Sequence, residues 1–145
     1  MTETVEAPVI GKIAILGGTG KEGKGLAYRW AKAGYRILIG SRQEEKALAV
    51  AGELRGMLDA SEQIEGMTNE LAAGQADLVV ITVPYAAHKA MCEQMREYVQ
   101  GKIVIDVTVP LVPPKVTRVQ MPAAGSATQE AQQIFGDGVQ VLAAF

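Results

Sequence analysis

Residues 12–25 read KIAILGGTGKEGKG, and this stretch does most to predict the fold. The apolar, β-branched run KIAIL (12–16) stops at a glycine, which is typical of a strand buried on both faces of a parallel sheet. Apolar residues then recur at helical spacing as far as Gly34, and glycine is common just past a helix end. The stretch therefore predicts a strand, a glycine-rich turn and a helix.

The rest of the chain repeats this alternation. Further strands are expected at 36–40, 77–84, 102–107 and near the C-terminus, with a weak edge strand at 62–66. Helices are expected over 41–58, 68–74, the segment between Pro84 and Gly101, and 127–135, the last with Ser126 and Gln129 at capping-box spacing; the proline-rich stretch before it is expected to be a loop. The pattern predicts an α/β fold, a Rossmann-like doubly wound parallel sheet of about six strands in the order 3-2-1-4-5-6.

Length and charge limit the function classes. The 145 residues suit one domain over 11–145, preceded by a flexible tail at 1–10. The net charge is −2 with scattered Lys and Arg, which indicates neither a nucleic-acid surface nor a polybasic membrane anchor. The N-terminus lacks the pattern of a signal peptide, the apolar runs are shorter than the roughly 20 residues that span a bilayer, and Cys92 has no cysteine to pair with. We expect a cytoplasmic enzyme or binding domain.

The glycine-rich turn predicts a phosphate site. It fits the pattern G-x-G-x-x-G with Gly18, Thr19, Gly20, Lys21, Glu22 and Gly23. In this pattern the first glycine allows a tight turn, the second lets the backbone approach a pyrophosphate, and the third lets helix and strand pack closely. A plain tight turn would need the same residues, and Gly17, Gly20 and Gly23 also fit G-x-x-G-x-x-G, so the motif alone does not choose a subfamily of dinucleotide folds.

The end of the second expected strand favours NADP over NAD. NAD-specific domains place Asp or Glu there to bind the ribose 2′-hydroxyl, whereas this chain has Ser41 and Arg42, with Lys46 one turn later. A hydroxyl and two cations would bind the 2′-phosphate of NADP. Ser41 and Glu44 also have capping-box spacing, and the two cations have an alternative reading as ordinary solvated charges.

Catalytic side chains are not expected. No carboxylate pair, nucleophile–base constellation or metal-ligand spacing is found, and the Y-x-x-x-K spacing of Tyr85 and Lys89 is interpreted as a coincidence. The segment after the strand at 77–84 nevertheless lies where open α/β sheets bind ligands. Thr82, Val83, Pro84, Tyr85 and His88 are therefore predicted to border the nicotinamide ring, with an exposed helix position as the alternative for His88.

Several blocks together resemble one known family, the NADP-dependent reductases of the deazaflavin coenzyme F420. These blocks are ILGGTGKEGKGLA, IGSRQEEKA, ITVPYAAH, GKIVIDVTVPL and the C-terminal GSATQEAQ…VQVLAAF, and the resemblance spans 11–145. A more distant resemblance, to the reductase domain of membrane metalloreductases, rests on the same blocks. The family resemblance implies pyrophosphate contacts at Thr19 and Gly20, 2′-phosphate contacts at Ser41, Arg42 and Lys46, and a nicotinamide side at Val83, Pro84 and Tyr85.

The resemblance also implies the chemistry. Hydride passes between the nicotinamide and the deazaflavin, so the protein has to hold the two rings and needs no acid or base. Tyr85 stands where the family often has Trp, and His88 lies one place after the family's usual His position. Members continue past the sixth strand with segments that cover the deazaflavin and form a dimer, so this chain is either a piece or a short protein whose partner or own homodimer supplies the cover. A non-catalytic NADP-binding module, or a reductase domain serving a flavin or metal site on a partner, remains the alternative.

Overall fold

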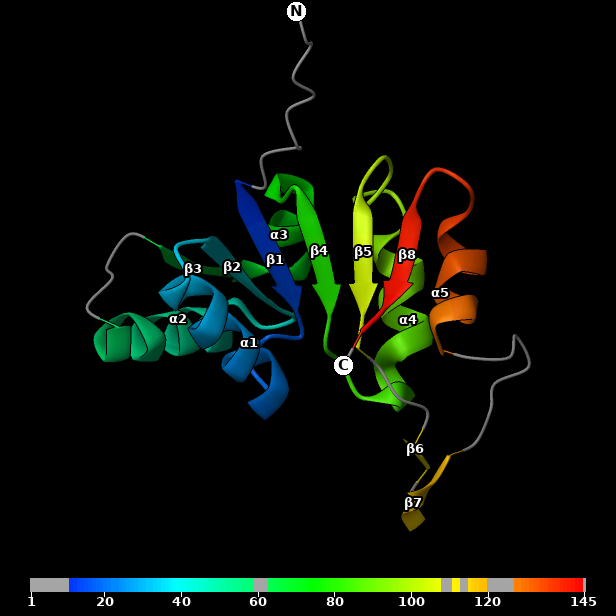
Figure 1. The fold of residues 1–145 in the computed structure, drawn as a ribbon, viewed down its shortest axis with the longest axis horizontal. Coiled ribbons are helices and arrows are strands. Elements are labelled where there is room, and N and C mark those ends of the chain that lie inside the picture. The colour runs from blue at the N-terminus through cyan, green and yellow to red at the C-terminus, as the bar shows by residue number, and fades with distance from the viewer. Residues whose placement is uncertain (1–10, 59–62, 108–110, 113–114, 120–126, 145) are drawn as a thin grey trace, which may run out of the picture.

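The computed structural model describes residues 11–58, 63–107, 111–112, 115–119 and 127–144. Its main sheet is built from β1 (Lys12–Leu16), β2 (Arg36–Ser41), β3 (Ile64–Thr68), β4 (Leu78–Ile81), β5 (Ile103–Asp106) and β8 (Gln140–Ala143). All neighbouring strands are parallel, and their order is β3-β2-β1-β4-β5-β8 (Figure 1). Since β8 is the sixth strand of this sheet, the predicted order 3-2-1-4-5-6 is confirmed. The expected tail at 1–10 and the capping residue Ser126 lie outside the described residues.

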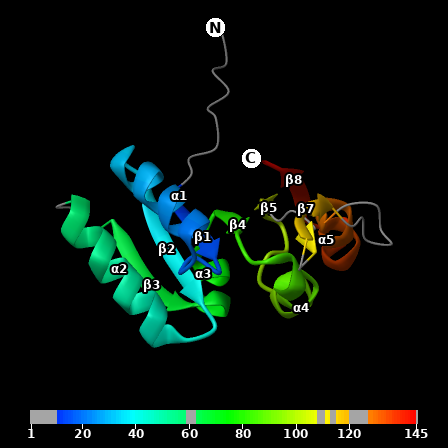
Figure 2. The ribbon, with the colours of Figure 1, turned by 90° about the horizontal axis from the view of Figure 1, so that it is seen from below.

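Helices cover both faces of the sheet. They are α1 (Lys21–Lys32), α2 (Glu44–Leu58), α3 (Asn69–Gln75), α4 (Tyr85–Met95) and α5 (Ala127–Phe135). One core holds the apolar sides of α1 and α2, and a second core, on the opposite face, holds those of α3, α4 and α5 (Figure 2). In the central strand β1, Ile15 packs into the first core and Leu16 into the second, both with 0 % exposure. This two-sided burial explains why the strands read as continuous apolar runs.

The face of the sheet that carries α1 and α2 is only partly covered. No described helix lies over β5 and β8 on that side (Figure 1). Ile103 and Leu142 are accordingly 42 % and 45 % exposed. Parallel sheets are normally covered on both faces, so this is an unusual apolar surface for such a fold.

Two local predictions were wrong. The proline-rich segment contains β6 (Leu111–Val112) and β7 (Lys115–Val119), which pair antiparallel, where a loop was expected; the β-branched residues of the second strand favour extended backbone. The capping box at Ser41 does not form, because α2 begins only at Glu44 and Ser41 is the last residue of β2. The Ser41 hydroxyl instead accepts a hydrogen bond from the backbone N–H of Gln43 at 3.2 Å.

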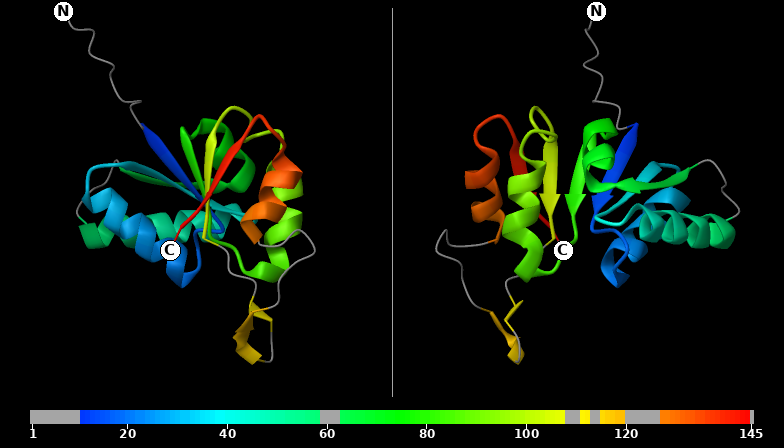
Figure 3. Two further views of the ribbon diagram at one scale, coloured as in Figure 1. Left: turned by 45° about the vertical axis from the view of Figure 1, so that its right-hand side comes forward. Right: turned by 180° about the vertical axis from the view of Figure 1, so that it is seen from behind.

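The parallel strands bring the functional turns together. Their carboxyl ends lie at one edge of the sheet, where the chain leaves β1 for α1, β2 for α2, β3 for α3 and β4 for α4 (Figure 3). Within the described ranges, no helix is long and apolar enough to cross a membrane.

Candidate functional site

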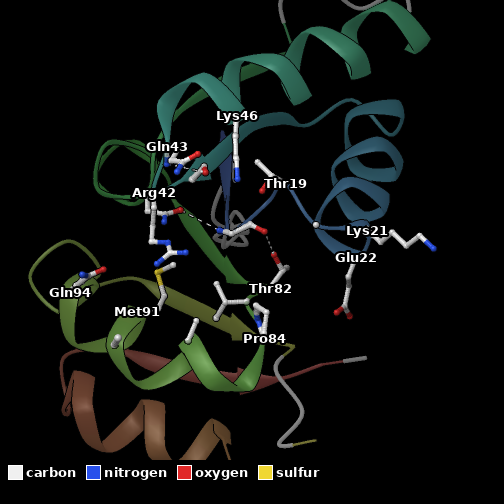
Figure 4. Close-up of a pocket in the computed structure, with 17 residues that line it drawn as sticks. Thr19, Lys21, Glu22, Arg42, Gln43, Lys46, Thr82, Pro84, Met91 and Gln94 are labelled. Atoms are coloured by element: carbon white, nitrogen blue, oxygen red, sulfur yellow. Dashed lines mark hydrogen bonds between the residues drawn. The ribbon is translucent and has the colours of Figure 1, made fainter. Parts of the chain in front are cut away.

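A cleft of about 570 Å³ opens at this edge of the sheet (Figure 4). Its volume is within the range of small-molecule sites. The predicted site residues that line it are Thr19, Gly20, Lys21, Glu22, Ser41, Arg42, Lys46, Thr82, Val83 and Pro84. Segments from three βα turns, far apart in the sequence, therefore share one cleft.

The glycines of the first turn have separate structural roles. Gly17 has φ +69°, and a Cβ there would stand 2.5 Å from Val83 Cγ1, so the left-handed backbone of this turn lies at Gly17, the residue before the G-x-G-x-x-G pattern begins. A Cβ on Gly23 would stand 2.7 Å from Gly18 Cα, which is the close packing predicted for the third glycine. Gly18 and Gly23 thus shape the turn and do not line the cleft. A Cβ on Gly20 would meet nothing within 4 Å, so its backbone borders open space.

The N-terminus of α1 faces this cleft without a side-chain cap. Its N-cap is Gly20, which has no side chain to accept a hydrogen bond from the first turn. The first backbone N–H groups of a helix lack intrahelical partners, and the helix dipole makes this end positive. Such an end binds phosphate readily.

Cations gather at the neighbouring end of β2. Arg42 and Lys46 are exposed and line the cleft, and neither forms an ion pair with any described residue. Ser41 is only 7 % exposed, at the base of the same turn. Figure 4 shows Arg42 and Lys46 directed into the cleft, whereas Lys21 extends away from them. This part of the cleft therefore suits an anion.

The β4–α4 turn forms another wall. The Thr82 hydroxyl lies 2.9 Å from the carbonyl oxygen of Leu16 and 3.2 Å from that of Gly17, and it donates to these acceptors. This contact ties the end of β4 to the glycine turn. Val83 and Pro84 continue the wall beyond it.

Tyr85 and His88 lie outside the cleft lining, although both were predicted to border the cofactor. Tyr85 is half-buried on the first turn of α4. His88 has 0 % exposure, and its Nε2 lies 2.7 Å from the buried carboxylate of Asp106, with Glu130 3.9 Å from Nδ1. The alternative of an exposed helix position for His88 is wrong, because α4 turns this imidazole toward the end of β5.

Several lining residues were missed by sequence reasoning. They are Gln43, Asn69, Ala87, Ala90, Met91 and Gln94, together with Gly17, which only the alternative glycine spacing included. Asn69 carried a signal, since it directly follows the third strand and the carboxyl ends of parallel strands share one edge. The residues of α4 carried none beyond helical spacing.

Within the described ranges, no group of three or more His, Cys, Asp or Glu side chains could hold a metal ion. Burial raises the pKa of the Cys92 thiol to about 12, and the nearby carboxylates of Asp106, Glu130 and Glu93 contribute. A thiol with that pKa is protonated and unreactive near neutral pH. The described cleft thus offers backbone N–H groups, cations and apolar walls to a ligand.

Comparisons with known proteins agree on one family. The family described as NADP oxidoreductase, coenzyme F420-dependent, matches residues 12–110. Among curated proteins, the F420-dependent NADP reductase of Methanothermobacter thermautotrophicus is 42% identical over 141 residues, and that of Methanocaldococcus jannaschii is 39% identical over 140. Both alignments cover 92% of this chain, but only 60% and 62% of the respective relatives. The chain therefore spans about three fifths of their length.

Solved structures give the same fold. A protein from Arthrobacter sp. FB24, named as a candidate F420-dependent NADP reductase, superposes with a TM-score of 0.74 at 26% identity, over 92% of this chain and 61% of that one. The lactate dehydrogenase of Cryptosporidium parvum superposes with a TM-score of 0.66 at 16% identity, over 90% of this chain and 43% of that one. The second likeness concerns the fold alone.

Proposed function

This chain belongs to the coenzyme F420-dependent NADP oxidoreductase family, and from that premise we propose that it is the NADP-binding domain of an enzyme that transfers hydride between NADP(H) and the deazaflavin coenzyme F420. The observation that carries the proposal is the cleft in which an uncapped helix N-terminus lies beside Arg42 and Lys46. These features bind two separate anionic groups. NADP has two, a pyrophosphate and a 2′-phosphate.

The pyrophosphate fits the glycine turn. The backbone at Gly20 borders space that a Cβ would enter without meeting any atom within 4 Å. The N–H groups of the first turn of α1 lack a competing side-chain acceptor. A diphosphate can therefore approach the backbone closely and be stabilised by the helix dipole.

The 2′-phosphate fits the end of β2. This strand ends at Ser41, and no Asp or Glu follows before Glu44, which belongs to α2. An NAD-specific site would place a carboxylate at this end to bind the ribose hydroxyl. Arg42 and Lys46 instead favour a phosphate dianion, so we propose NADP and not NAD.

Binding and orientation are the tasks that the proposal assigns to this domain. When bound, NADPH supplies the hydride that the reaction needs. Val83 and Pro84 offer an apolar wall, and the Thr82 hydroxyl holds that wall against the glycine turn. Close positioning of the reacting rings and exclusion of water then account for catalysis without an acid or base from this chain. Tyr85 is proposed to border the nicotinamide side from the edge of this wall, and the buried His88 is proposed to act indirectly, by fixing the position of α4 against β5.

The full reaction needs more surface than this domain offers. The domain over 11–145 spans about 60% of its curated relatives, and the apolar face of β5 and β8 is open, with Ile103 and Leu142 exposed. We propose that a homodimer or a further segment covers the deazaflavin and this face. The proposal includes a cytoplasmic location, where NADP(H) is available as an electron carrier.

One absorbance experiment tests the proposal. Protein, NADPH and oxidised coenzyme F420 are mixed under anaerobic conditions, and the visible absorbance of the deazaflavin is followed. Loss of absorbance at a rate proportional to protein concentration supports the enzyme. Saturable NADPH binding without any loss of absorbance would contradict it, and would support a non-catalytic NADP-binding module instead.

A further inference from the structure

Asn69 occupies an unusual place for a polar side chain. It is the first residue of α3, it is only 2 % exposed, and it nevertheless lines the cleft. Its Oδ1 accepts a hydrogen bond from the backbone N–H of Gly17 at 3.2 Å. A Cβ on Gly40 would stand 2.6 Å from the same oxygen, so a glycine at the end of β2 leaves the room that this carboxamide needs.

The contact with Gly17 fixes which way the carboxamide points. A backbone N–H can only donate, so the atom that faces Gly17 must be the carboxamide oxygen. The NH₂ group is therefore directed away from the glycine turn. Thr68 holds this arrangement in place, since its hydroxyl caps α3 by accepting from the N–H of Leu71 at 3.4 Å.

The NH₂ group is a free donor. Among the described residues, no hydrogen bond is found for Asn69 Nδ2. His88 Nδ1 is the one side-chain nitrogen or oxygen atom of these residues that is both fully buried and without a hydrogen-bond partner, so Asn69 Nδ2 must retain some exposed surface. Asn69 lines the cleft. A nearly buried donor that lacks a protein partner favours an acceptor on a ligand.

The position in the sheet indicates which part of a ligand lies there. In the register of β2 and β3, Ser41 pairs with Thr68, so Asn69 follows directly beside the Ser41–Arg42 turn. That turn is the proposed site of the 2′-phosphate. The adenosine half of NADP is therefore the half that comes within reach of the Asn69 carboxamide.

We propose that Asn69 is a further cofactor-binding residue, whose Oδ1 holds the glycine turn while its NH₂ group donates a hydrogen bond to the adenosine half of NADP. The acceptor is a ribose oxygen or a ring nitrogen of the base. This inference rests on the proposed function, because it requires NADP in the same cleft.

Two variants distinguish the loss of the NH₂ donor from the effect of an added negative charge. Asn69→Asp keeps an oxygen for the N–H of Gly17 and replaces the NH₂ group by a second oxygen. Gln94→Glu makes the same change of carboxamide to carboxylate elsewhere in the cleft lining, so it reports the effect of added charge alone. We expect Asn69→Asp to weaken NADP⁺ binding at least tenfold, and Gln94→Glu to weaken it by a clearly smaller factor. Equal losses in the two variants would overturn the donor role.

A second measurement uses the unmodified chain. The side-chain NH₂ signals of Asn69 are assigned in a ¹H–¹⁵N spectrum, by their absence from the spectrum of Asn69→Asp, and followed during titration with NADP⁺ and with adenosine 2′,5′-bisphosphate. We expect both ligands to shift these signals. If the backbone signals of the glycine turn move while the Asn69 signals stay, NADP binds and the inference is wrong. If no signal moves with either ligand, both the proposed function and the inference about Asn69 are wrong.

Discussion

Replacing Arg42 with alanine should weaken NADP⁺ binding and leave NAD⁺ binding nearly unchanged. Arg42 is exposed, lines the cleft and forms no ion pair with a described residue, so in the free protein its guanidinium is available to a phosphate. NAD⁺ has a hydroxyl where NADP⁺ has the 2′-phosphate, and it cannot gain from this cation. The two ligands differ only at the group in question, which makes their comparison selective.

The size of the effect follows from the exposure of Arg42. A hydrogen bond to a charged group contributes about 1.5–3 kcal/mol. Water screens an exposed pair, so the lower end applies here, and about 1.5 kcal/mol corresponds to about a tenfold rise in Kd. Lys46→Ala should raise the Kd for NADP⁺ by a smaller factor, because an ammonium cannot form the bidentate contact that a guanidinium forms with a phosphate. Raising the ionic strength should reduce the difference between wild type and variant.

Isothermal titration of both ligands measures these changes. Arg29→Ala is the matched control, since Arg29 is an exposed arginine in the last turn of α1 and does not line the cleft. It should leave both affinities unchanged. An equal loss for NAD⁺ and NADP⁺ in Arg42→Ala, or no loss for NADP⁺, would refute the assignment of the 2′-phosphate to this turn.

Three further predictions concern the turn and the buried side chains. Gly23→Ala should lower the free energy of unfolding by about 1–3 kcal/mol, since its Cβ would stand 2.7 Å from the backbone of Gly18. Gly20→Ala should keep the melting temperature of wild type and weaken NADP⁺ binding. A Gly23→Ala variant as stable as wild type would contradict the close packing at Gly23. His88→Leu should lower the free energy of unfolding, measured in urea, by about 3–5 kcal/mol, because it removes the imidazole that lies 2.7 Å from the Asp106 carboxylate. His88→Gln should lower it by less, and equal losses in the two variants would argue against a stabilising contact between His88 and Asp106. The Cys92 thiol has its ordinary pKa of 9.0 in the unfolded chain but a pKa of about 12 in the folded protein, so the free energy of unfolding should fall as pH rises between these values. Urea unfolding at several pH values measures this dependence. If the free energies of unfolding of wild type and Cys92→Ala change in parallel with pH, Cys92 is not the cause.

The sheet could be predicted from the sequence because its central strands β1, β2 and β4 are almost entirely buried. The run KIAIL coincides with β1, and right-handed crossovers limit the possible strand orders to a few once strands and helices alternate. The cleft residues of the glycine turn and of the Ser41–Arg42 turn could also be predicted, since each turn has its pattern within one short segment of sequence. Their common location then follows from parallel strands.

The remaining features depend on contacts between distant segments. The hydrogen bond from Gly17 to Asn69 joins residues 52 apart, and the contact of His88 with Asp106 joins residues 18 apart. Neither pair leaves a periodic pattern in the sequence. Helix α4 has small or apolar residues on two adjoining sides, so its spacing could not show that Met91 reaches the cleft while His88 faces β5. The proposed role of Asn69 depends on the space beside Gly40, which no pattern in the sequence indicates.

In the proposed reaction, hydride passes directly from NADPH to the deazaflavin while this protein holds both. The most direct measurement uses NADPH carrying deuterium at C4 of the nicotinamide, in each of its two stereochemical forms, with mass spectrometry of the reduced deazaflavin. Direct transfer predicts deuterium in the product from one form and not from the other, because a nicotinamide ring held in one orientation presents a single face to the acceptor. A reduced product without deuterium from either form, or one that takes up deuterium from D₂O at the same position, would contradict the claim.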